Sequence, residues 1–265
     1  MLTTSINTID LSAFAAINQT APAETVSSKY AFIPTTQALT VLADYGWLPT
    51  QACEAKTRKA EHKGFQRHAI RLINEKMNIE LMTSDVLPQL LLRNSHAGTS
   101  SFILTEALHV MLCSNGLVKA SGVQDEIRVR HIGYTDGLME AAVREITTGI
   151  PETMGETDRF KRLMLTEGER EAFAAAAIEL RFDGEKYAVE PRQMLQTARR
   201  AEKDPNLWNT MNVVQEKVIR GGVRQVRADG TRIKSRKVTD IKEDIRLNKA
   251  LWTLTEQMAK LKEAQ

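Results

Sequence analysis

Two apolar stripes near the C-terminus constrain the fold more than any other feature of the sequence. In residues 207–218 large apolar side chains recur at intervals of four, three and four residues, and residues 247–261 repeat that rhythm. These intervals place the side chains on one face of an α-helix. Two such stripes suit helices that pack at a shallow angle. Residues 206–265 are therefore predicted to form a helical hairpin, with Trp208 and Trp252 in its core or at an interface.

The connection between these two helices is strongly basic. Residues 220–237 hold seven Lys or Arg side chains and a single acid. Asp229-Gly230 is typical of a tight hairpin turn, so we expect either a β-hairpin or a basic loop. A basic segment held between patterned helices favours a polyanionic partner over a loop that is merely solvated. The side chains predicted to contact nucleic acid here are Arg220, Arg224, Arg227, Arg232, Lys234, Arg236 and Lys237.

The first half of the chain has the pattern of short strands. Strand-length segments occupy residues 47–56, 65–73, 86–93 and 126–131, and the last alternates apolar with basic side chains. If these strands share a sheet, alternation presents a basic face. That predicted face comprises Arg67, Arg71, Arg128 and Arg130, and Arg93 is also predicted to contact DNA.

Other local signals complete the predicted secondary structure. A strand is expected at 29–33, a helix at 35–45 capped by Thr35 or Thr36, a helix at 106–114, a turn at Asn115-Gly116 and a helix from Pro191 to about Lys203. Thr166-Glu-Gly-Glu169 has capping-box form and opens a further helix. Thr239 is expected to cap the last helix.

These elements predict an α+β fold, with an antiparallel sheet core covered by helices and a C-terminal helical hairpin. The predicted organisation is an N-terminal tail (1–28), an α+β core (29–150), a helical segment (151–205) and the hairpin with its basic connection (206–265).

Composition excludes several classes of protein. No run approaches the roughly 18 apolar residues of a membrane span, and the N-terminus lacks the pattern of a signal peptide. Cys53 and Cys113 are the two cysteines, too few for a disulfide framework. We therefore expect a reduced, cytoplasmic protein without membrane contact.

Catalytic motifs are absent from the sequence. It contains no HExxH, CxxC or phosphate-binding glycine loop, so we predict no metal, no cofactor and no enzymatic activity. Cys113 with His96 or His131 could form a Cys–His pair, but the apolar surroundings of Cys113 favour a buried, inert thiol. The polar side chains Asn209, Asn212, Gln215 and Glu216 either contact nucleic acid or cap neighbouring segments.

Five separated blocks resemble, in order, a phage- and plasmid-like family built on a domain of unknown function. They are NSHAGTSSF (94–102), CSNGL (113–117), RVRH (128–131), LWNTMNVVQE with RGG (207–222) and LNKALW (247–252). The resemblance extends from about Lys29 to Leu261. It implies a mobile-element setting, where handling of incoming DNA or evasion of host defence fits, and it implies no established activity.

The sequence thus predicts a DNA-binding protein that holds single strands by their backbone, because aromatic residues for base stacking are only 5%. More specifically, we expect it to anneal single strands in recombination as a homo-oligomer. Its subunits would be joined through exposed stripes or the N-terminal tail.

The alternative is an antirestriction factor that binds a host protein through the acidic segment 132–180, whose net charge is −5. A hydrolase using Cys113 is a second alternative.

Overall fold

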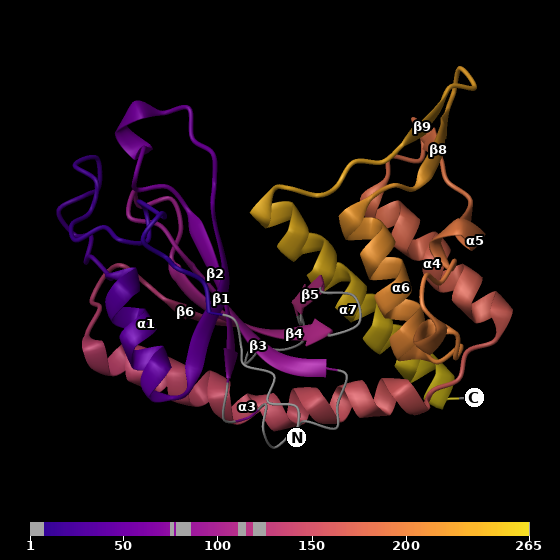
Figure 1. Ribbon diagram of the computed structural model, residues 1–265, viewed down its shortest axis with the longest axis horizontal. Helices are drawn as coiled ribbons and strands as arrows, with labels where there is room; N and C mark the ends of the chain where they lie inside the picture. Colours follow the sequence, from indigo (N-terminus) through magenta and orange to yellow (C-terminus); the bar gives the residue numbers. More distant parts are fainter. Residues whose placement is uncertain (1–7, 75–76, 78–85, 111–114, 119–125, 265) are drawn as a thin grey trace. The chain divides into compact units, whose positions relative to one another are not determined.

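The computed structural model describes residues 8–74, 77, 86–110, 115–118 and 126–264. The chain forms two compact units, residues 1–150 and 151–265, and each is described by itself (Figure 1). The predicted α+β class is confirmed: the first unit is built on an antiparallel sheet, and the second ends in a helical hairpin.

The first unit contains a six-stranded sheet. Its strands are β1 (Trp47–Glu54), β2 (His68–Asn74), β3 (Val86–Asn94), β4 (Phe102–Val110), β5 (Asn115–Val118) and β6 (Glu126–Val129), with a 3-10 turn, η1 (Ala60–His62), after β1. The strands pair antiparallel in the order β1-β2-β3-β4, and both β5 and β6 pair with the remaining edge of β4.

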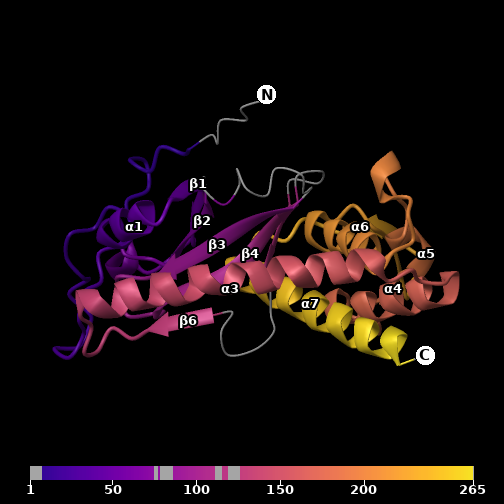
Figure 2. The ribbon, with the colours of Figure 1, turned by 90° about the horizontal axis from the view of Figure 1, so that it is seen from below.

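One face of this sheet forms the apolar core of the unit. Since side chains alternate along a strand, the register places Trp47, Leu72, Leu90 and Leu108 on the same face, and all four are fully buried. Helix α1 (Thr35–Asp44) packs beside β1. Trp47 Nε1 donates to Thr147 Oγ1 at 3.1 Å, which ties the N-terminal part of α3 (Asp136–Arg162) to this face (Figure 2).

Two predictions in this unit are wrong in the same place. Residues 106–110 of the helix expected at 106–114 belong to β4, whose backbone pairs with β3 on one edge and with β5 and β6 on the other. Residues 111–114 lie outside the described residues. The turn expected at Asn115-Gly116 is instead the start of β5, paired with Val110 and His109. Pairing between distant strands overrides the local preference in both cases.

The segments before the sheet also differ from prediction. Residues 29–33 form no strand, although Ala31 N donates to His131 O at 2.5 Å. The N-cap of α1 is Pro34 rather than a threonine. Residues 8–28 pack onto the unit, since Ile17 is fully buried.

The second unit is mainly helical. After α3 it contains α4 (Glu167–Arg181), α5 (Pro191–Met194), η2 (Arg200–Glu202), α6 (Leu207–Arg220) and α7 (Ile241–Glu263), with a small sheet of β7 (Tyr187–Ala188), β8 (Arg224–Arg227) and β9 (Arg232–Lys234). The capping box that opens α4 is confirmed. The helix expected from Pro191 to Lys203 ends at Met194, because the Glu202 carboxylate accepts the amides of Ala198 and Arg199 and holds a turn there.

The predicted pairing of α6 with α7 is confirmed, and the stripes are largely used inside the unit. Trp208 and Trp252 are buried, and Phe160 packs edge-on to Trp252 with ring centroids 5.5 Å apart. Gln215 Nε2 donates to Asn248 Oδ1 at 2.8 Å between the two buried side chains. At the C-terminal end of the second stripe Leu261 is exposed.

Candidate nucleic-acid interface

Residues 220–237, here called the basic hairpin, form the predicted β-hairpin between α6 and α7. Strands β8 and β9 are joined by a turn in which Arg227 N donates to Thr231 O at 2.9 Å. Gly230 adopts a φ of 80°, which the turn requires and glycine accepts without strain. The hairpin projects beyond the ends of both helices (Figure 1).

The strand register places three cations on one face of the basic hairpin. Arg224 lies opposite Lys234, and Val226 lies opposite Arg232. Because alternate residues share a face, Arg224, Arg232 and Lys234 surround Val226, which is 40% exposed. Arg227 points to the other face. All three cations of the first face are exposed.

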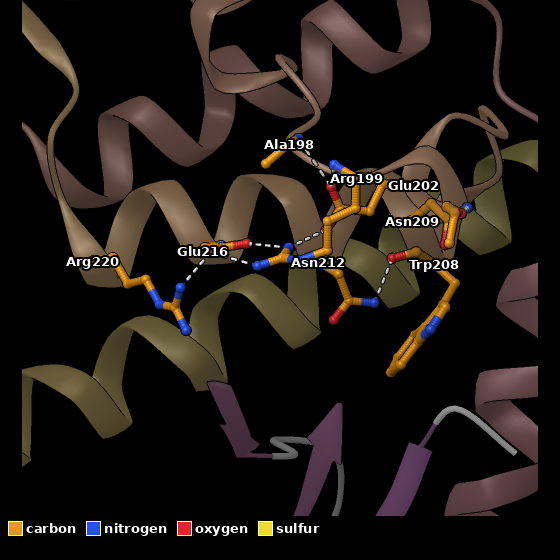
Figure 3. Close-up of polar contacts among 9 residues, drawn as sticks. Ala198, Arg199, Glu202, Trp208, Asn209, Asn212, Glu216 and Arg220 are labelled. Carbon is orange, nitrogen blue, oxygen red and sulfur yellow. Dashed lines mark hydrogen bonds and ion pairs between the residues drawn. The ribbon is translucent and has the colours of Figure 1, made fainter. Parts of the chain in front are cut away.

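At the base of the hairpin, Arg220 belongs to an internal ion-pair network rather than to this face. Its guanidinium lies 2.7 Å from Glu216, which also accepts from Arg199 at 2.8 Å (Figure 3). Arg199 pairs in addition with Glu202. The hydrogen bond from Arg199 is the main cause that lowers the pKa of Glu216, so this carboxylate stays ionised. Arg236 and Lys237 are exposed beyond β9.

The polar side chains of α6 have structural partners, which favours the second of the two predicted roles. Asn212 donates to Trp208 O at 2.8 Å (Figure 3). Asn209 donates to Ala201 O and Asp204 O. Glu216 holds Arg199, as above. Asn209 and Glu216 thereby fasten η2 and its flanking residues to α6.

The first unit carries the second predicted basic set. By register Arg71, Arg93 and Arg128 lie on one face of the sheet, opposite the face that carries Trp47. Arg67 directly precedes β2, and Arg130 directly follows β6.

The charge of this sheet face is partly neutralised within the unit. Glu126 lies 2.9 Å from Arg93 and 3.0 Å from Arg128, and Arg71 Nη1 donates to Gln89 Oε1 at 3.1 Å. Burial is the main cause that lowers the pKa of Arg93. The exposed hairpin face is therefore the stronger candidate for polyanion contact.

A buried histidine cluster is the feature that sequence reasoning missed. His68, His96 and His131 lie far apart in the sequence but close together around Thr35 and Tyr30. Thr35 Oγ1 is 2.8 Å from His68 Nε2 and 3.2 Å from His96 Nε2. The Tyr30 ring stacks on His131 at 4.4 Å between centroids.

Burial keeps these histidines neutral. It is the main cause that lowers the pKa of His68 to about 4 and that of His96 to about 3, and the neighbouring imidazoles add to the shift of His96. Within the described residues, no group of three or more His, Cys, Asp and Glu side chains is arranged to hold a metal ion. Cys113 lies outside the described residues, so the Cys–His alternative stays untested.

The acidic segment 132–180 has cationic partners of its own. Glu169 lies 2.9 Å from Lys262, and Glu171 lies 2.6 Å from Arg192. Each pairing reduces the negative field that a DNA-mimicking surface would need. None of the helices in the described ranges has the length and apolarity to cross a membrane.

These observations define a two-unit α+β protein that presents a basic β-hairpin between packed helices. The chain belongs to the family of the domain of unknown function DUF932, whose model matches residues 22–252. The family resemblance read from the five sequence blocks is thereby confirmed.

Two relatives come from Escherichia coli (strain K12). The UPF0380 protein YfjQ is 32% identical over 236 residues, covering 89% of this chain and 84% of its own length. The UPF0380 protein YafZ is 32% identical over 242 residues, with the same coverage. No solved structure matches the chain.

Proposed function

We propose that this protein is a non-enzymatic, cytoplasmic DNA-binding protein of a mobile element, and that it holds single strands by their phosphates. One observation carries the proposal: Arg224, Arg232 and Lys234 share an exposed face of a projecting hairpin. Arginine and lysine on such a face neutralise phosphates and release their counterions. The contact is to the backbone, so it favours binding with little sequence preference.

The hairpin suits a flexible strand. Exposed Val226 lies among the three cations, and an apolar side chain beside phosphate contacts can meet an unpaired sugar or base. The base faces of paired DNA are covered by stacking, so contact between Val226 and a base face favours a single strand.

A direct test is fluorescence anisotropy with a labelled single strand of about 40 nucleotides and with the matching duplex, at low and at physiological salt. We expect binding of the single strand in preference to the duplex, and loss of affinity as salt rises. Absence of binding at low salt contradicts the proposal and favours a host protein as the target.

We propose further that subunits assemble along the strand and anneal single strands in recombination. Light scattering with and without DNA measures the mass of the particle. A mass that rises by several subunits on addition of the strand is the expected result. A monomer under both conditions contradicts assembly while leaving strand binding intact.

A further inference from the structure

A pocket lies beside the basic hairpin, within the second unit. It has a volume of about 290 Å³ and lies between α5, the end of α6 and the β8–β9 ladder. That volume is near the lower limit for ligand pockets, roughly 300 Å³. Its lining residues are Gln193, Gln196, Lys217, Gly222, Val223, Arg224 and Lys234.

Three of these lining side chains are cations, and none of the described lining residues is acidic. Arg224 and Lys234 lie directly opposite each other across the ladder, an arrangement of like charges that destabilises a hairpin by itself. Neither has a carboxylate partner within the described part of the chain. A bound anion would remove this repulsion, and Lys217 adds a third positive charge to the same pocket.

The backbone around the pocket is held in place by reciprocal hydrogen bonds. Gln193 Nε2 donates to Arg224 O and its Oε1 accepts from Arg224 N, both at 2.9 Å. Gly222 N donates to Ser235 O at 2.9 Å, and Val223 N donates to Ser235 Oγ at 3.1 Å. Arg224 and Lys234 therefore start from a fixed backbone, which lowers the ordering cost of ligand binding.

The positive charge of the pocket favours one kind of phosphate. A phosphate inside a DNA strand is a diester with one negative charge, whereas a terminal phosphate is a monoester with a charge of about −1.5 to −2 at pH 7. An internal diester offers two non-bridging oxygens, whereas a terminal monoester offers three, one for each cation of the pocket. Three cations match the doubly charged monoester best.

Resting on the proposed strand binding, we infer that this pocket takes the terminal phosphate of a DNA strand. Lys217, Arg224 and Lys234 contact its oxygens, and the rest of the hairpin face holds the internal phosphates that follow. Strands with a phosphorylated end are therefore the preferred ligands.

The test compares three single strands of one sequence: one with a 5′-phosphate, one with a 3′-phosphate and one with hydroxyl groups at both ends. Anisotropy titrations should show about tenfold tighter binding of one phosphorylated strand than of the hydroxyl strand, as expected for charge-assisted hydrogen bonds. Which phosphorylated strand binds tighter identifies the end that is recognised.

Variants separate the pocket from the remainder of the hairpin. Lys217→Gln and Lys234→Gln should each abolish most of the preference for a phosphorylated end. Arg232→Gln is the matched control, because Arg232 lies on the same hairpin face but outside the pocket. It should weaken binding of all three strands and leave their ratio unchanged.

The outcomes distinguish this inference from the function on which it rests. Equal affinity for all three strands overturns the terminal-phosphate pocket and leaves strand binding standing. A preference that survives in both pocket variants, with folding verified by circular dichroism, also overturns it. Failure of every strand to bind overturns the proposed function, and the inference with it.

Discussion

Thr35 begins α1, yet its hydroxyl lies in the buried histidine cluster instead of capping the helix. Asn94 Nδ2 donates to it at 3.1 Å, and two imidazoles lie within hydrogen-bond distance. Asn94, Ser95 and His96 are all fully buried. The NSHAG block is thus a structural connection between the end of β3 and the start of α1.

The histidine cluster makes stability depend on pH. An unfolded histidine binds its proton near pH 6.5, whereas His68 and His96 in the folded protein do so only at about 4 and about 3. Protons therefore bind preferentially to the unfolded chain as pH falls below 6.5, and stability is lost. We expect the unfolding free energy from urea titrations to fall by at most about 1.4 kcal/mol per pH unit for each histidine between about pH 6 and pH 4.

The variant His96→Gln gives the control for this prediction. With one such histidine removed, its stability curve should be flatter over the same pH range, whatever its stability at pH 7. Parallel curves for the two proteins would show that carboxylates elsewhere cause the acid sensitivity.

Gly221 and Gly222 offer a second test, which concerns the close packing of the chain on either side of the basic hairpin. Both have positive φ, but a Cβ on Gly221 would lie 2.7 Å from the backbone of Arg236, whereas a Cβ on Gly222 meets nothing within 4 Å. Gly222→Ala should lower the free energy of unfolding by about 1–2 kcal/mol, because alanine is strained at a positive φ. Gly221→Ala should lower it clearly more, because the added Cβ also forces the backbone of Arg236, after β9, to move. Equal losses of stability for the two variants in thermal unfolding experiments would contradict the close approach of Gly221 to the backbone of Arg236.

At the scale of elements, the N-terminus of α7 is set by Asp240. Its Oδ1 accepts from Glu243 N at 2.9 Å, so the prediction of Thr239 as the cap is wrong by one residue. Asp240→Ala should lower stability by about 1 kcal/mol. The adjacent Thr239→Ala, at an exposed position, should change it by less than about 0.5 kcal/mol. A larger loss of stability for Thr239→Ala than for Asp240→Ala in urea titrations would show that Thr239 is the cap.

Elements specified by local patterns were predictable, and elements specified by distant pairing were not. Three signals lie within short stretches of sequence: the apolar stripe of α6, the apolar stripe of α7 and the Asp229-Gly230 turn. The structure contains all three of the predicted elements. Strand β4 is buried on both faces, so it shows no alternation and its apolar run also fits a helix.

The same distinction explains which parts of the candidate site were found. The cations of the basic hairpin are contiguous in sequence, so composition revealed them. Lys217 and Gln193 join the pocket only because α5 packs against α6 and β8. The three histidines meet through strand pairing and α1, and nothing in their spacing indicates it.

At the scale of the whole molecule, each unit carries its own basic set. In the first unit Glu126 lies between Arg93 and Arg128 and limits the charge of the sheet face. In the second, the ion pairs of Arg199 and Arg220 with Glu216 lie at the base of the hairpin, and the cations of β8 and β9 stay exposed. We therefore propose the hairpin as the main contact with the strand.

The decisive measurement for the hairpin contact is the salt dependence of single-strand binding, compared between the wild type and a variant with Arg224, Arg232 and Lys234 changed to alanine. Each lost phosphate contact should reduce the slope of log affinity against log salt by about 0.7, and three contacts by about 2. A control with Arg162, Lys203 and Lys260, exposed cations outside the hairpin, changed to alanine should keep the wild-type slope. Equal slopes for the hairpin variant and the wild type would contradict the claim.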